Sequence, residues 1–537
     1  MSGLCLGRQK LWGWQTRGFI QEILTMVKKD ARSEIRLTSD MDAAETGQKE
    51  RLDPDRKFTV AVLGDLGAAA GSGAPLLQRR FIKVDRDNFD SVMERIGPRW
   101  EGVLALPLEG GTSEPRVTLV FGSVEDFHPD RIVRQIPSLR RVQSMLSRLG
   151  DPSALDEIES QLKAWICLPE KSAADPSAPP RGVDSSQLLD AMLEGGELPL
   201  PARPAERSDN LRRFVEKIVA PHAVRVDSGR QEALSTAIHG LLSGSVRSIL
   251  HERAFQALES TWRSLFRLVR NADIGGEIQL RVLQVTKDEI LGDITSGREL
   301  EESDLARLLL GAASVPGSDA PSVLVGDYYF SHMLEDLAVL ERMGHLAARL
   351  RAPFIAGASP SIFGWQSFTD LGKPERPPTD FGGVAGKAWQ LLRRSGPGHW
   401  IALALPRLLC RMPYGADSDP TETFQFEEGI AANDHDLLLW GNPAYAVAET
   451  YATAFEKYGW EMKPASEVQR LDGLPIYVYK ESGETTVVPC AEALMTGAAA
   501  ESLIKAGFLP ILSRRGTDAV SMPSLQTIAD PRAAIPL

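Results

Sequence analysis

PSVLVGDYYFSHMLEDLAVLERMGHLAARLRAPFIAGAS, residues 321–359, is the stretch that decides the fold. It opens on an apolar run, continues with a segment of helical spacing, and ends on a second apolar run. Short apolar runs bounded by turn signals are typical of buried strands, and strands that alternate with helices favour a parallel sheet. The stretch therefore predicts a strand, a helix and a second strand.

The same alternation continues on both sides of this stretch. A strand is predicted at 277–285, followed by a helix that Thr286 and Glu289 begin as a capping box. A further strand is predicted at 399–406 and a helix at 441–460, with Asn442 as its cap. The fold class is therefore predicted to be α/β, in a mixed α+β arrangement.

The N-terminal part, residues 56–166, has its own pattern of strands and helices. Strands are predicted at 58–64, 79–85 and 116–122, and a helix at 86–97 with Asp85 or Asp87 as its cap. Pro129 suits the first turn of a later helix, which Pro137 breaks.

A stretch rich in proline, alanine and serine separates this part from the strand–helix alternation. It is predicted to be an extended linker that contains one short amphipathic helix, SSQLLDAMLEGG. The predicted organisation is two lobes joined by a Pro/Ala/Ser-rich linker. Its segments are an N-terminal extension, partly disordered (1–55), a first domain (56–166), the linker (167–208), a second domain (209–530) and a tail (531–537).

Composition excludes several classes of protein. A formal net charge of −12 over 537 residues argues against nucleic acid as a partner, because phosphate binding needs a basic surface. No apolar run approaches the roughly 18 residues of a membrane span, and LWGWQTRGFIQEIL (11–24) is too polar for a signal-peptide core. The four cysteines lie far apart, so we expect a reducing compartment, no zinc site and a cytoplasmic protein with no direct membrane insertion.

The glycines after the first strand are the main candidate for a nucleotide site. A phosphate-binding loop needs a lysine after its glycines, or a helix that begins there, and neither follows Gly64, Gly67, Gly71 and Gly73. We therefore interpret the segment as a loop between strands, with a nucleotide-binding α/β enzyme as the weaker alternative.

The other candidate groups favour a structural interpretation. Asp434, His435 and Asp436 are adjacent and are interpreted as a solvated turn rather than a metal site, while Glu427 and Glu428 are expected to form salt bridges across an interface. No nucleophile, base and orienting group come together in the sequence. We predict no enzyme activity, no cofactor and no metal.

Longer motifs resemble one known family. RRFIKVDRDNFDSVMERIGPRW (79–100) and VTLVFGSVEDFHPDRIVRQIPSLR (117–140) resemble the small sheath protein of the bacterial type VI secretion system. The large sheath protein of the same machine is similar to the stretch that decides the fold, to ILHERAFQALESTWRSLFRLV (249–269) and to IALALPRLLCRMPYGADSDPTETFQFEE (401–428). The chain thus resembles a fusion of the small and large sheath subunits.

This resemblance implies a structural subunit that polymerises into a helical sheath or ring around an inner tube and stores energy for contraction. The implied partners are further copies, the inner tube protein, baseplate components and a sheath-recycling AAA+ ATPase. Large subunits of this family continue past the motif at 507–524 with another domain, so a non-polymerising adaptor or capping component is the alternative.

The resemblance also suggests specific contact residues. The linker helix resembles the peptide that the ATPase recognises, and its anchors are Leu188, Leu189, Met192 and Leu193. Permanent packing of that helix on the folded body is the alternative. Candidates for a domain or subunit interface, each of which could equally be ordinary core, are Phe89, Val92, Phe127, Ile132, Ile136, Phe255, Leu258, Trp262 and Leu265.

Overall fold

The computed structural model describes most of the chain from Arg56 onward. The described residues are 56–67, 74–104, 116–151, 153–166, 228–296, 298–314, 320–372, 381–430, 434–464, 470–481 and 484–536. The stretch Lys57–Leu537 forms one compact unit. The predicted extension, the linker and its helix lie outside the described residues, so the predicted segment boundaries stay predictions.

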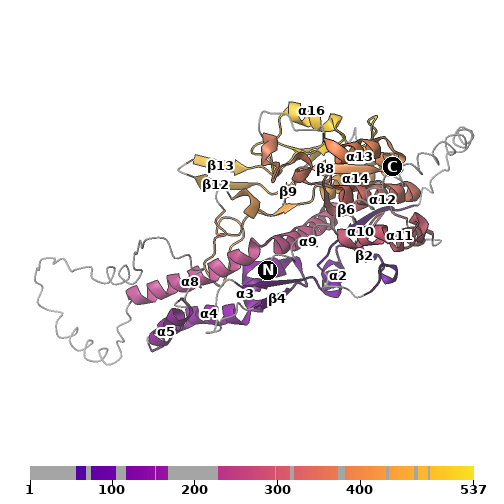
Figure 1. Ribbon diagram of the computed structural model, residues 1–537. Helices are drawn as coiled ribbons and strands as arrows, with labels where there is room; N and C mark the ends of the chain where they lie inside the picture. Colours follow the sequence, from indigo (N-terminus) through magenta and orange to yellow (C-terminus); the bar gives the residue numbers. More distant parts are fainter. Residues whose placement is uncertain are drawn as a thin grey trace, which may run out of the picture. The chain divides into compact units, whose positions relative to one another are not determined.

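A seven-stranded sheet forms the centre of this unit (Figure 1). Six neighbouring strands run parallel, and β2 joins one edge antiparallel to β5. The α/β class is therefore confirmed. In spatial order the strands are β14 (Leu509–Pro510), β8 (Ile401–Leu405), β7 (Phe354–Ala358), β6 (Val323–Phe330), β1 (Phe58–Gly64), β5 (Ile278–Gln284) and β2 (Ile82–Val84).

Strand β1 joins the N-terminal part to the rest of the unit. It comes from the N-terminal part, yet it lies between β5 and β6, pairing Phe58 with Ile278 and Val60 with Val323. All seven of its residues are buried, as expected for a strand that is apolar except for Thr59 and is covered on both faces. The two predicted lobes therefore share one sheet.

Helices cover both faces of the sheet. Alternate residues of β1 point to opposite faces, so Val60 packs with one cluster of buried side chains and Ala61 with another. The Val60 face is covered by α9 (Arg253–Asn271) and α14 (Ala444–Tyr458). The other face is covered by α10 (Lys287–Thr295), α11 (Asp304–Ser314), α12 (Leu334–Leu350) and α13 (Gly383–Arg394).

The rest of the N-terminal part packs beside α9 and α8 (Ser228–Leu250), on the Val60 side of the sheet. As predicted, Pro129 opens one helix and Pro137 opens the next, because proline cannot continue a helix but fits its first turn. The elements are α2 (Phe89–Ile96), β3 (Arg99–Val103), β4 (Arg116–Val120), η2 (Val124–Phe127), α3 (Pro129–Gln135), α4 (Pro137–Arg148) and α5 (Leu155–Ile166).

Small elements complete the C-terminal part. Ile535, in the predicted tail, is buried against the core. The elements are β9 (Leu408–Leu409), η7 (His435–Leu437), β10 (Trp440–Gly441), β11 (Arg470–Leu471), β12 (Tyr477–Glu481), β13 (Glu484–Val488), α16 (Gly497–Lys505), β15 (Leu512–Ser513) and β16 (Val520–Ser521).

The first residues of the helices show whether the predicted N-cap residues are correct. The capping box of Thr286 and Glu289 is confirmed. The predicted cap of α2 at Asp85 or Asp87 is wrong, because Asn88 precedes the helix and its backbone N–H donates to the Asp85 carboxylate at 3.0 Å.

Candidate functional interface

Helix α9 packs against the N-terminal part, and we call this contact the seam. Its N-cap residue, Glu252, accepts a hydrogen bond from the backbone N–H of Phe255 at 2.9 Å. The same carboxylate oxygen accepts one from the indole of Trp100 on β3 at 2.8 Å. One side chain therefore both begins the helix and binds the N-terminal part to it.

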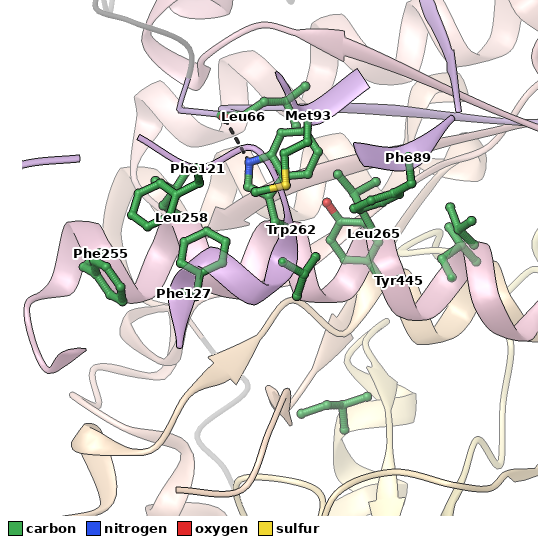
Figure 2. Packing of buried hydrophobic residues seen from close by; sticks show 14 of the residues in the cluster. Leu66, Phe89, Met93, Phe121, Phe127, Phe255, Leu258, Trp262, Leu265 and Tyr445 are labelled. Atoms are coloured by element: carbon green, nitrogen blue, oxygen red, sulfur yellow. Dashed lines mark hydrogen bonds between the residues drawn. The ribbon is translucent and has the colours of Figure 1, made fainter. Parts of the chain in front are cut away.

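Aromatic side chains from both parts meet in the seam (Figure 2). Phe89 of α2 lies edge-on to Trp262, with ring centroids 5.8 Å apart, and Phe127 of η2 lies edge-on to Phe255 at the same distance. Edge-to-face pairs of this kind are favourable beyond their buried area. These four predicted interface residues are therefore in contact within one chain.

The other predicted interface residues are also buried. Leu258 packs against Gly67, where an added Cβ would lie 2.2 Å from its Cδ1 atom. Val92, Ile132, Ile136 and Leu265 belong to the same core cluster. The role of these residues in contacts between separate subunits stays a prediction.

Sequence reasoning missed other aromatic residues of the seam. Trp100 and Phe121 each lie 5.9 Å from Phe255, edge-on. The alternation of buried Trp100 with exposed Arg99 and Glu101 was the available signal, since a strand with one buried face alternates in this way.

Other polar contacts across the seam are made to backbone carbonyls. The indole of Trp262 donates to the carbonyl of Leu66 at 3.1 Å. The guanidinium of Arg86 donates to the carbonyls of Val269, Arg270 and Ala272 at 2.8–3.2 Å. The carbonyls of Val269 and Arg270 have no partner within the end of α9, whereas that of Ala272 also accepts from the backbone N–H of Ile274 at 2.7 Å. Arg86 therefore gives the first two a donor and places a cation at the negative end of the helix.

Asp130 makes a second connection, between α3 and the loop that follows Tyr414. Its carboxylate is buried and accepts hydrogen bonds from the backbone N–H of Glu422 at 2.8 Å and from the hydroxyl of Thr423. A carboxylate that accepts several hydrogen bonds holds its partners in a fixed geometry. The loop is therefore fixed beside the start of α3.

A buried ion network lies beneath the same loop. Arg411 binds Glu259 of α9 and Glu428, each at 2.7 Å. Burial by itself would raise the pKa of Glu428, but Arg411, His251 and the N–H of Tyr414 lower this pKa to about 2. Glu428, which was expected to pair across an interface, pairs inside the chain, while Glu427 is exposed.

A second buried carboxylate lies outside the seam. Glu492 accepts two hydrogen bonds from Arg407, both at 2.7 Å, and another from the N–H of Phe368. Burial opposes its ionisation, yet the bonds from Arg407 and His435 lower the pKa of Glu492 to about 2. His435 and Asp436 lie near this pair, at 3.6 Å from Glu492 and 4.0 Å from Arg407 respectively.

Doubly wound sheets bind ligands at the carboxyl ends of the two neighbouring strands from which the chain continues in opposite directions across the sheet. In this sheet those strands are β1 and β6. In this chain, the Thr261 hydroxyl of α9 donates to Asp327 at 2.6 Å, and burial raises the pKa of that carboxyl. A cavity of about 40 Å³ lies nearby, beside Tyr445. Ligand pockets are several times larger.

The glycine-rich loop after β1 is described up to Gly67 and again from Ala74. The next element is the short 3-10 helix η1 (Leu76–Gln78), and then β2. The described residues thus show no α-helix that begins at this loop and could bind phosphate. They also hold no cluster of three histidine, cysteine or acidic side chains suited to a metal.

Two further expectations concern helices. The candidate ATPase-recognition residues Leu188, Leu189, Met192 and Leu193 lie outside the described residues. Within the described part of the chain, no helix is both long enough and apolar enough to cross a membrane.

Comparison with known proteins gives two matches that follow one another along the chain. Residues 232–529 match the family described as "EvpB/VC_A0108, tail sheath N-terminal domain". Residues 29–163 match the family described as "Type VI secretion system, VipA, VC_A0107 or Hcp2". The second match begins inside the predicted N-terminal extension.

Two curated relatives are similar to the same two parts, both from Pseudomonas aeruginosa. The type VI secretion system sheath protein TssC1 is 31% identical over 306 residues, which is 56% of this chain and 61% of TssC1. The sheath protein TssB1 is 30% identical over 97 residues, which is 18% of this chain and 55% of TssB1. The chain thus spans less than two thirds of each relative.

Proposed function

We propose, from the premise that this chain belongs to the type VI secretion tail sheath family, that it is a structural subunit of a contractile sheath. In this subunit one polypeptide supplies both the small and the large sheath parts. The observation that carries the proposal is β1, a strand of the small part that lies between two strands of the large part. The two parts therefore act as one building block.

The proposed role is mechanical rather than enzymatic. Sheath proteins are a structural family, and α9 and its neighbours fill the ligand position of the sheet. Copies would polymerise around an inner tube in the cytoplasm, dock on a baseplate, and store energy in alternative packings between subunits. The absence of a nucleotide-binding step is a part of this proposal.

Electron microscopy of the purified protein tests the proposal, alone and with any tube protein encoded beside it. Tubes or cogwheel-shaped cross-sections would support a sheath subunit. Particles found only at the ends of tubes would support the adaptor instead. A monomer that never associates, with or without the tube protein, would contradict both.

Recognition by a recycling ATPase is a separate part of the proposal. The predicted anchors Leu188 and Leu189 would enter a groove of the ATPase, because helix-in-groove binding uses apolar residues at helical spacing. We expect Leu189→Asp to abolish retention on the immobilised ATPase while tubes still form. Undiminished retention would show that this helix is not the recognition element.

A further inference from the structure

The exposed charged side chains of α3 and α4 are all basic. Arg131 and Arg134 of α3 and Arg140 of α4 are exposed, and the sequence from 131 to 150 contains no acidic residue. The buried side chains of α4, such as Leu139 and Val142, lie on its opposite face. We call Arg131, Arg134 and Arg140 the basic face.

None of these three arginines forms an ion pair with another described residue. Arg148, at the end of α4, is bound to Glu157 and is left out of the basic face for this reason. An unpaired arginine at the surface is available to a carboxylate on another molecule, which its planar guanidinium can bind through two hydrogen bonds.

An acidic surface lies on the loop after Tyr414. The sequence from 412 to 436 contains seven acidic residues and no lysine or arginine. Asp417 and Glu422 are exposed and form no ion pair within the described part of the chain. We call these two residues, with the exposed Glu427, the acidic loop.

The acidic loop has a fixed position next to the basic face. Asp130, one residue before Arg131, accepts hydrogen bonds from the backbone of Glu422 and from Thr423. Opposite charges thus lie side by side on one chain without pairing with each other. Such a surface is complementary to the same surface on a second copy, when the second copy is placed so that its acidic loop faces the basic face of the first.

We propose that the basic face of one copy binds the acidic loop of a second copy. The proposal rests on the proposed function, because it names the contact through which sheath subunits would associate. Such an interface is heterologous, because it joins different surfaces of two identical chains. When it repeats from copy to copy, it gives a closed ring or a helical polymer. Nucleic acid and anionic lipid fit less well, because the adjacent acidic loop and the net charge of −12 repel them.

Charge reversal with mutual rescue tests the proposal in the full-length chain. The first variant is Arg134→Glu/Arg140→Glu, and the second is Asp417→Arg/Glu422→Arg. Arg514→Glu/Arg515→Glu is the matched control, since both arginines are exposed and form no ion pair among the described residues. Sedimentation velocity at 50 and 500 mM NaCl measures the association of each protein alone and of the first two variants mixed.

We expect the wild type and the control to associate at low salt and to dissociate at high salt, because salt screens exposed charges. Each of the first two variants alone should associate at least about tenfold more weakly, a loss of about 1.4 kcal/mol. Their equimolar mixture should recover association, because the two charges reversed on each surface of one chain then face charges of opposite sign on the other chain.

Three results would overturn the proposal. They are a wild type that stays monomeric at low salt, variants that associate as the wild type does, and a mixture that shows no recovery. Binding of the monomeric wild type to phosphatidylglycerol vesicles or duplex DNA, lost in the first variant, would assign the basic face to that ligand instead. Tubes formed equally by wild type and variants would leave the proposed function standing and disprove this contact alone.

Discussion

At the residue scale, Arg411 holds two buried carboxylates from distant parts of the chain. Its guanidinium is enclosed between Glu259 and Glu428 and is itself only 9% exposed. Removing it would leave Glu259 with Arg263 as its remaining arginine and Glu428 with none, and a buried charge that loses its partner costs more than the pair contributes. Arg411 is therefore a point where one substitution disturbs both α9 and the segment that contains Glu428.

We predict that Arg411→Ala lowers the free energy of unfolding by about 3–5 kcal/mol. Denaturant unfolding followed by tryptophan fluorescence measures the change. Arg515→Ala is the control and should shift the free energy by less than about 0.5 kcal/mol, because its side chain is exposed. Equal stability of the two variants would contradict the account of the buried network.

The lowered pKa values of two buried carboxylates predict that the free energy of unfolding depends on pH. Glu428 and Glu492 each have a folded pKa of about 2, below the ordinary 4.5 of the unfolded chain. The unfolded state therefore binds protons more tightly, and stability present above pH 5 is lost as the pH falls toward 2. We expect the free energy of unfolding to fall over this window.

The variant Glu492→Gln should make that fall shallower, although it destabilises the protein at neutral pH by leaving Arg407 without its partner. Unfolding curves recorded at intervals between pH 7 and pH 3 give the slope. Glu157→Gln, at an exposed position, should leave the slope unchanged. A slope in Glu492→Gln as steep as that of the wild type would contradict the assignment.

At the element scale, α9 contacts the N-terminal part through its apolar side. Trp262 is 1% exposed, packs on Phe89 and donates to the carbonyl of Leu66. We predict that Trp262→Ala lowers the free energy of unfolding by about 3–5 kcal/mol, because it opens a cavity and leaves a buried carbonyl unpaired.

The matched control is Leu391→Ala on α13, where the side chain is 51% exposed. Its effect should stay within about 0.5 kcal/mol. Thermal unfolding of both variants by calorimetry compares them directly. A small effect at Trp262 would mean that the seam contributes little to the stability of the unit.

Strands and helix boundaries could be predicted from the sequence where the signal is local. The apolar runs at 321–330 and 352–359 are β6 and β7, and the break at Pro137 separates α3 from α4. The cap of α2 was wrong because the side chain of Asp85 binds the backbone of Asn88 before the helix begins. Such reciprocal hydrogen bonds depend on turn geometry that residue preferences alone do not specify.

Only part of the candidate interface could be predicted from the sequence, because the rest depends on contacts between residues far apart in the chain. Large apolar residues at helical spacing, such as Phe255 and Trp262, identified the buried side of α9. The sequence does not show which strands are neighbours, because pairing joins residues that are hundreds of positions apart. The position of β1 between β5 and β6 could therefore not be predicted from its own residues.

At the scale of the whole molecule, the shared sheet predicts how the chain responds to cutting. We expect that cleavage at a protease site inserted between Ile166 and Ser228 leaves the two fragments bound together. Strand β1 pairs with β5 over seven residues and with β6 over four, so release of one fragment would open the sheet.

Size-exclusion chromatography after cleavage checks this outcome, with denaturing electrophoresis to show that the cut is complete. The fragments should elute together in buffer and separate in concentrated guanidinium. Separate elution in buffer would mean that the covalent connection alone keeps the two parts together.

The position of β1 also has a consequence for synthesis of the protein on the ribosome. Strand β1 is made long before its second neighbour is complete, because β6 ends at Phe330, more than 250 residues later. At ~5–20 residues per second, the delay is roughly 15 to 50 seconds. Until β6 is made, the nascent strand has at most one of its two neighbours, β5, and a chaperone at the ribosome exit would find there a short, largely apolar segment to protect.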